Sequence, residues 1–169
     1  MTVQEAVEQT PHLQRAWKAG LGALRARDRP HIAAENTRNL TGSVDADMAL
    51  QRQEPHAHRW DFAIGYQHAN RTAECVYWVE IHTASDKQVK VVLDKLRWLK
   101  SWLAGDGVRL RRFERDFVWV SSGSTSFTLT SPQQKQFALL GLQHKGTVLR
   151  ITNARPGSFT AAPRKTTRA

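Results

Sequence analysis

Hydrophobic residues form two contrasting patterns in the middle of the chain. Between residues 59 and 66 large apolar residues alternate with other residues, and over residues 75–82 the sequence CVYWVEIH is almost continuously apolar. A period of two predicts a strand whose two faces differ, whereas a β-branched and aromatic run predicts a strand buried on both faces. The polar segment 67–73 between them predicts a hairpin connection.

The clearest helical periodicity follows, between Ser85 and Gly105. Ser85 is a favourable N-cap residue, Gln88 occupies the third position of a capping box, and Gly105 is a typical C-cap residue. The apolar residues between these ends recur every three or four positions and predict one buried stripe, formed by Val89, Val92, Leu93, Leu96, Leu99 and Leu103.

Weaker patterns predict the remaining elements. In chain order they are a helical segment over 3–27, a short strand over 40–48, a buried strand over 116–120, a helix over 131–143 that ends at Gly146, and a last strand over 147–152. The Ser/Gly-rich segment 121–127 predicts a loop. The order helix, three strands, helix, strand, helix, strand predicts an α/β fold with a mixed central sheet flanked by helices.

A change of composition near the C-terminus sets the predicted domain boundary. Residues 1–152 carry the large apolar residues of a single domain, which divides into an N-terminal helical segment over 1–30 and a sheet core over 31–152. From Asn153 the chain is rich in Pro, Gly, Ala, Thr and basic residues. We therefore expect a disordered, basic tail over 153–169.

The chain is strongly basic. It has 25 Lys and Arg against 15 Asp and Glu, a formal net charge of +10. Such a field attracts polyanions: nucleic acid first, anionic lipid second and an acidic protein third. The first residues lack the apolar segment of a secretory signal, and no stretch approaches the roughly 18 apolar residues of a membrane span. Together with a single cysteine, Cys75, these features predict a cytoplasmic protein.

Three polar residues stand out on the two central strands. Asp61 lies near the start of the first, and Glu80 and His82 lie near the end of the second, two residues apart and therefore on one face. If the strands pair through the 67–73 turn, Asp61 lies across from Glu80. The two carboxylates and the backbone carbonyl of Ile81 would then offer hard oxygen ligands, which suit Mg²⁺ or Mn²⁺.

The order of elements, with Asp61 on the second strand and Glu80-Ile81-His82 on the third, resembles the PD-(D/E)xK superfamily of restriction-endonuclease-like nucleases. The resemblance covers residues 3–120 by order of elements. It implies a restriction-endonuclease-like fold in which the two acids hold a divalent metal. It also implies that a lysine two positions after the second acid positions or activates the attacking water.

His82 stands where the superfamily carries this lysine. An imidazole there can act as a general base near neutral pH, can bind a metal such as Mn²⁺, or can simply hydrogen-bond a backbone carbonyl. The superfamily also accepts a basic residue from the following helix, where Lys87 and Lys90 are available. The candidate catalytic residues are therefore Asp61, Glu80, His82 and Lys87.

Basic residues elsewhere are candidates for contacts with a nucleic-acid backbone, because each phosphate contact releases bound counterions. They are Arg59, Arg97, Lys100, Arg109, Arg111, Arg112 and Arg115, and the tail adds Arg155, Arg164, Lys165 and Arg168.

These observations favour metal-dependent phosphodiester hydrolysis of nucleic acid. The alternative, motivated by His82 at the lysine position, is a catalytically inactive relative that binds nucleic acid or a partner protein. A partner protein would fit a toxin–immunity or defence system in which the basic surface meets an acidic one. A second resemblance, to small bacterial proteins without an established activity, is carried by Gly42-Ser43-Val44, Asp47, Arg59-Trp60-Asp61 and Val79-Glu80-Ile81-His82.

Overall fold

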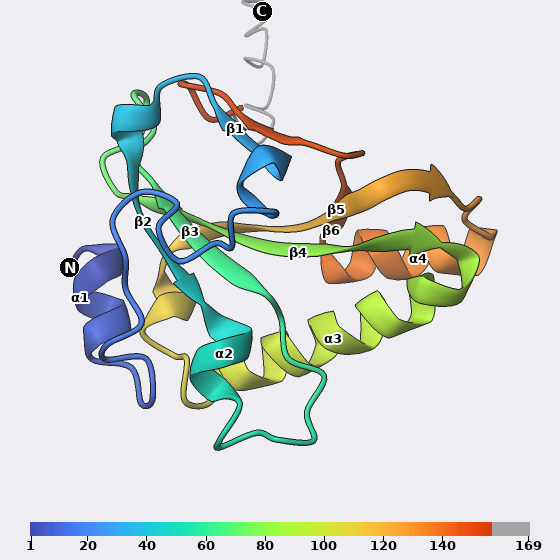
Figure 1. Cartoon of the computed structure of the whole chain (residues 1–169), viewed down its shortest axis with the longest axis horizontal. Helices are drawn as coiled ribbons and strands as arrows, with labels where there is room; N and C mark the ends of the chain where they lie inside the picture. The colour runs from blue at the N-terminus through green and yellow to red at the C-terminus, as the bar shows by residue number, and fades with distance from the viewer. Residues whose placement is uncertain (157–169) are drawn as a thin grey trace, which may run out of the picture.

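A mixed sheet of five strands forms the centre of the computed structural model, which describes residues 1–156 (Figure 1). In spatial order the strands are β2 (Leu40–Asp45), β3 (Phe62–Tyr66), β4 (Cys75–Ser85), β5 (Glu114–Ser126) and β6 (Leu142–His144). β2, β3 and β4 are antiparallel neighbours, whereas β4, β5 and β6 run parallel. The α/β class and the mixed central sheet flanked by helices are confirmed.

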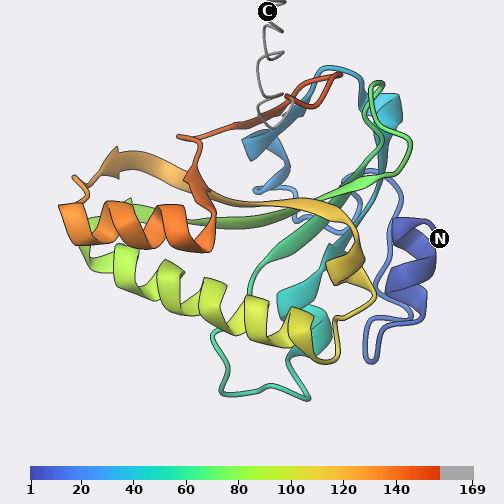
Figure 2. The same cartoon turned by 180° about the vertical axis from the view of Figure 1, so that it is seen from behind.

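Helices and a second, two-stranded sheet cover opposite faces of this central sheet (Figures 1 and 2). The helices are α1 (Val3–Glu8), α2 (Ala46–Leu50), α3 (Asp86–Ala104) and α4 (Ser131–Leu140). The small sheet pairs β1 (Ile32–Ala34) with β7 (Leu149–Ile151) in parallel. The short 3₁₀ helices of the described chain are η1 (Arg29–His31), η2 (Thr37–Asn39) and η3 (Leu110–Arg112). α3 and α4 lie side by side against one face, and β1 and β7 lie against the other.

The alternation of side chains along β4 divides the core into two layers. Trp78 is fully buried in the layer that contains the apolar stripe of α3, and Val79 is fully buried in the layer beneath β1 and β7. Successive side chains of a strand point to opposite faces. Glu80 therefore shares the face of Trp78 and points toward α3.

The two central strands, their hairpin and the long helix occur where the sequence predicts them. β4 is buried over its first six residues, and Phe62 of β3 pairs with Val79 of β4. β3 is shorter than the strand predicted over 59–66, since it begins at Phe62 rather than at Arg59. Trp60 consequently packs in the α3 layer and not beside Phe62.

The predicted N-terminal helical segment is mostly wrong. Only Val3–Glu8 is helical, and a sequence of turns follows. His12 has a left-handed backbone with φ of 67°, and the backbone of Lys18 forms an antiparallel bridge with Ser43 of β2. The apolar residues that imitate a helical stripe are buried for different reasons, because Leu13 belongs to the α3 layer and Leu24 to the opposite layer.

The C-terminal half also departs from the predicted pattern. The predicted loop 121–127 is mostly a continuation of β5, whose Thr125 and Ser126 pair with the end of β4 after a bulge. α4 ends at Gly141, which adopts a left-handed backbone with φ of 72°, so Gly146 is not its stop. The predicted last strand contains β7, which pairs with β1 outside the central sheet.

The predicted tail begins too early. Residues 153–156 are described, and Arg155 is buried with 8 % of its surface exposed. The rest of the predicted disordered tail, with Arg164, Lys165 and Arg168, lies outside the described residues. Within residues 1–156 no helix is long and apolar enough to cross a membrane.

Candidate functional site

Asp61, Glu80 and Lys95 form a charged cluster between the central sheet and α3. Asp61 immediately precedes β3, Glu80 lies on β4, and Lys95 lies in the middle of α3. Because Phe62 pairs with Val79, extending the antiparallel register by one residue places Asp61 opposite Glu80. The expected proximity of the two acids is confirmed.

Backbone and side-chain contacts lock the two carboxylates together. The backbone N–H of Asp61 donates to Oε2 of Glu80 at 3.1 Å. The backbone N–H of Ile81 donates to Oδ2 of Asp61 at 3.0 Å. The ammonium of Lys95 contacts Oε1 of Glu80 and lies 3.8 Å from Oδ1 of Asp61. One cation therefore faces both acids.

The cluster is buried at Glu80 and opens toward solvent at Asp61. The side chain of Glu80 is 0 % exposed, that of Lys95 14 % and that of Asp61 22 %. Burial, followed by the neighbouring Asp61 charge, raises the pKa of Glu80 to about 8, while Lys95 acts in the lowering direction. Burial also raises the pKa of Asp61 against the lowering influence of Lys95.

The carbonyl of Ile81 faces the same space as the Asp61 carboxylate. In an extended strand the N–H and C=O groups of one residue point to the same side. Since the N–H of Ile81 binds Asp61, its carbonyl is directed toward the segment that precedes β3. Two carboxylates and this carbonyl are hard oxygen donors of the kind that Mg²⁺ and Mn²⁺ prefer. A metal bound by them would have to compete with Lys95, which contacts both carboxylates.

The His82 side chain bonds to α3 and to neither acid. Its Nε2 atom forms a 2.7 Å hydrogen bond with Oε1 of Gln88 in the first turn of α3, and its carbonyl accepts a bond from the indole of Trp119. Gln88 is therefore not part of the predicted capping box, and the Ser85 side chain makes no capping bond. The structure brings His82 to the helix start rather than to the carboxylates.

The lysines expected on the following helix are not the one at the acids. Lys87 is exposed and makes no hydrogen bond or ion pair within residues 1–156. Lys90 pairs with Asp94 at 2.9 Å on the outer face of α3. Lys95 occupies the position instead. One sequence signal could have identified it, because Lys95 lies three residues after Val92 and therefore within the predicted apolar stripe.

The predicted backbone-binding residues do not gather around the acids. Arg109 to Arg115 lie in or next to the segment before β5, whose Glu114 pairs with Cys75 at the far end of β4. At about 3.3 Å per residue, Glu80 is roughly 17 Å from that end. These arginines therefore lie at the other end of β4 from Glu80.

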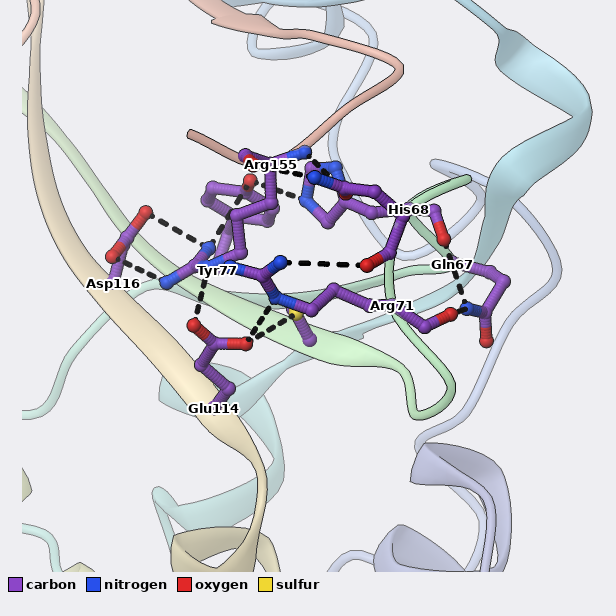
Figure 3. A network of polar contacts seen from close by, with 9 residues as sticks. Gln67, His68, Arg71, Tyr77, Glu114, Asp116 and Arg155 are labelled. Atoms are coloured by element: carbon purple, nitrogen blue, oxygen red, sulfur yellow. Dashed lines mark hydrogen bonds and ion pairs between the residues drawn. The ribbon is translucent and has the colours of Figure 1, made fainter. Parts of the chain in front are cut away.

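Several of the predicted binding residues are engaged within the fold, among them Arg109, which donates to Gln9, and Arg155, which pairs with Glu114 and Asp116 (Figure 3). Arg59 donates to Oδ1 of Asp47 at 2.9 Å and to the carbonyl of Glu54 at 2.6 Å, which fixes the loop before β3. Arg97 pairs with Asp94. Lys100 and Arg115 both lie over the ring of Phe117. Burial lowers the pKa of Lys100.

Within the described chain no group of three or more His, Cys, Asp or Glu side chains could by itself hold a metal ion. A metal at the cluster would thus rely on the backbone carbonyl of Ile81 as well as on the two acids. Comparison of the chain with known protein families, with curated proteins and with solved structures gave no match.

Proposed function

We propose that this chain is a metal-dependent nuclease in which Asp61, Glu80 and the carbonyl of Ile81 hold Mg²⁺ or Mn²⁺. The observation that carries the proposal is Lys95, which reaches from α3 to both carboxylates. The PD-(D/E)xK resemblance implies two acids with a lysine beside them, and it accepts that lysine from the following helix. Lys95 supplies what His82 and Lys87 do not.

The order and direction of the strands also support the proposal. β2, β3 and β4 form an antiparallel series, α3 crosses over, and β5 joins β4 in parallel. This agrees with the order of elements on which the resemblance depends.

Each residue of the cluster has a distinct role in the proposed reaction. The bound metal would polarise the phosphodiester and lower the pKa of the attacking water. Asp61, at the solvent side, would hold the metal where an incoming phosphate can reach it, while Glu80 would hold the metal from the inner side of the site. Lys95 places its ammonium beside the carboxylates of Asp61 and Glu80. There it can orient the attacking water or stabilise the charge that develops on the phosphate.

The test is cleavage of plasmid DNA and of a structured RNA with Mg²⁺ or Mn²⁺, comparing the wild type with Glu80→Gln, Lys95→Ala and Lys90→Ala. We expect losses of at least about 100-fold for the first two variants and near wild-type cleavage for Lys90→Ala, the matched control on the same helix. Circular dichroism verifies that each variant is folded. Equal activity of the wild type and Glu80→Gln would exclude this site as the source of cleavage.

His82→Ala and Lys87→Ala complete the assignment. If either lost activity while Lys95→Ala kept it, the basic role would pass from Lys95 to that residue. These variants distinguish a basic residue supplied by β4 or by the first turn of α3 from Lys95, because neither His82 nor Lys87 bonds to the acids within residues 1–156.

A binding protein without cleavage is the second candidate, and the complete burial of Glu80 favours it. With both Glu80 oxygens already bound, by Lys95 and by the Asp61 N–H, the carboxylate is satisfied without a metal. Calorimetry with Mg²⁺ and Mn²⁺ distinguishes the two functions. Nucleic-acid binding without metal binding at millimolar concentrations would favour the non-catalytic function.

A further inference from the structure

A cleft of about 320 Å³ adjoins the candidate metal site at the free edge of β4. β3 pairs with β4 only as far as Phe62 and Val79, so no described strand pairs with the next residues of β4 on that side. Ile81, whose N–H binds Asp61, lines the cleft. The residues that line it are Arg27, Asp28, His31, Ile81, His82, Thr83 and Ser122. The nucleotide next to a phosphate held at the two acids can therefore reach this cleft.

Asp28, at this cleft, is a buried acid without a hydrogen bond. Only 8 % of its surface is exposed, and although it directly precedes η1 as the N-cap residue, its side chain makes no capping bond. Within residues 1–156 the one cation within 4.0 Å of it is Arg27, whose Nε atom lies at 4.0 Å, beyond hydrogen-bond distance. The Arg27 side chain is 76 % exposed and remains free to meet a phosphate. A buried carboxylate without a donor is costly, which indicates that its donor comes from outside the chain.

His31 provides a second acceptor in the same turn. Its Nδ1 atom lies 2.7 Å from the carbonyl of Thr147. Because a carbonyl can only accept, Nδ1 carries the proton, and Nε2 of the neutral imidazole is left as an acceptor. The backbone N–H of His31 donates to the carbonyl of Asp28 at 3.0 Å, which holds the two residues together. The cleft thus offers a carboxylate and an imidazole nitrogen, and both require a donor.

The charge of Asp28 acts on the candidate metal site. Burial is the largest cause of the raised pKa of Asp61, and the charges of Asp47 and Asp28 act in the same direction. Asp28 is nevertheless no third metal ligand, because no group of three His, Cys, Asp or Glu side chains in the described chain could hold a metal ion. Its position therefore suits the part of a substrate that lies beside the metal.

We propose that this cleft receives the ribose of an RNA strand held at Asp61 and Glu80, with the 2′-hydroxyl donating to Asp28 or His31. The proposal names the substrate class of the nuclease function proposed above and rests on it. A 2′-hydroxyl is the group that distinguishes RNA from DNA at a given site. A deoxyribose in the same place has no hydroxyl to donate, so the buried carboxylate stays unsatisfied and DNA binds more weakly.

Fluorescence anisotropy with three short single strands of one base sequence tests the proposal. The strands are RNA, its all-deoxy equivalent and its 2′-O-methyl equivalent, and EDTA prevents cleavage. We expect the wild type to bind RNA at least about tenfold more tightly than either of the others, because hydrogen bonds to charged groups are among the stronger ones. The 2′-O-methyl strand keeps the ribose oxygen but cannot donate, so it should bind like DNA.

Asp28→Asn tests the residue. The variant keeps the shape of the side chain but removes the charged acceptor, so the preference for RNA should fall to less than about threefold. The matched control is Asp106→Asn, which removes the same charge from an exposed position outside the cleft and should keep the preference. Equal binding of RNA and DNA by the wild type, or a preference that Asp28→Asn leaves unchanged, overturns the proposal. Displacement of RNA by adenosine 5′-monophosphate at equal concentration also overturns it, in favour of a free nucleotide.

Cleavage measured separately with Mg²⁺ or Mn²⁺ distinguishes this proposal from the nuclease function. An RNA preference that depends on Asp28, without cleavage of any strand, supports the ribose site and removes the nuclease function. Cleavage that depends on Glu80 but is equal for RNA and DNA supports the nuclease function and overturns the ribose site.

Discussion

Replacing Glu80 by glutamine removes one titratable group from the buried cluster while keeping its shape. Two opposing influences act on the wild-type carboxyl. Burial favours the neutral acid, and contact with Lys95 favours the carboxylate. The balance decides whether Glu80 carries its charge at neutral pH, which is the state that a metal ligand requires.

The direction of the pKa shift fixes how stability depends on pH. A carboxyl whose pKa is raised on folding contributes stability below its ordinary pKa of 4.5 and loses that contribution as pH rises toward the folded value of about 8. The slope is at most about 1.4 kcal/mol per pH unit, so the whole window corresponds to an upper bound of about 5 kcal/mol. Glu80→Gln has no titrating carboxyl at this position, so its free energy of unfolding should not fall in this way as the pH rises.

The assay is urea unfolding at pH 5, 6, 7 and 8, followed by tryptophan fluorescence. We expect the free energy of unfolding of Glu80→Gln, relative to the wild type, to rise steadily over this range. The variant also loses the ionic contact with Lys95, which adds an offset, so the slope and not the absolute difference reports on Glu80. Glu8→Gln, an exposed change on α1, is the control for loss of one negative charge.

A flat difference between pH 5 and 8 would refute the reasoning. It would mean that the contact with Lys95 outweighs burial and keeps Glu80 ionised throughout. The cluster would then be a stable ion pair, and a metal could bind at neutral pH without displacing a proton.

Two further predictions concern the packing of the fold. Arg155→Ala should lower the free energy of unfolding by about 3 kcal/mol in urea titrations, because it leaves Asp116 without its bidentate partner at a largely buried site; an unchanged midpoint would place the residue outside the cooperative core. Gly42→Ala should cost about 1–3 kcal/mol, since a Cβ atom there would lie 2.1 Å from the Trp17 ring, whereas Gly123→Ala meets no atom within 4 Å and should change the thermal midpoint little. Similar midpoints for both glycine variants would contradict the packing of Trp17.

The elements with strong local signals are the ones that sequence reasoning located. β4 is a long apolar run, and α3 has a regular apolar stripe with suitable residues at both ends. Each of these two elements is therefore recognisable from its own residues, without knowing which elements pack against it. The prediction of a helix in the segment after α1 is wrong for a physical reason. Leu13 and Leu24 are spaced as if on one helix face, yet they are buried in different layers, and burial alone does not reveal which partner covers a residue.

Strand partners were the second limit. A Ser/Gly-rich sequence such as 121–126 has no apolar signal, and it is a strand only because the end of β4 lies beside it. β1 and β7 are three residues each and pair across more than a hundred positions of sequence, so neither could be identified from its own residues. The sequence places Arg155 in a tail because nothing beside it in the chain reveals its acidic partners, which lie on β5.

At the candidate site the sequence predicts the two acids correctly but not the basic residue beside them. Asp61 and Glu80 followed from the hairpin register, which depends on a turn of known length. Which basic residue lies beside the acids depends on how α3 is placed along β4. Residues two apart on β4 contact different turns of α3. His82 meets Gln88, whereas Glu80, only two residues earlier, meets Lys95 seven residues further along α3. A strand rises by about 3.3 Å per residue and a helix by 1.5 Å, so two strand residues span more than one helical turn. The lysine that faces the acids must therefore lie deeper in α3 than its first turns.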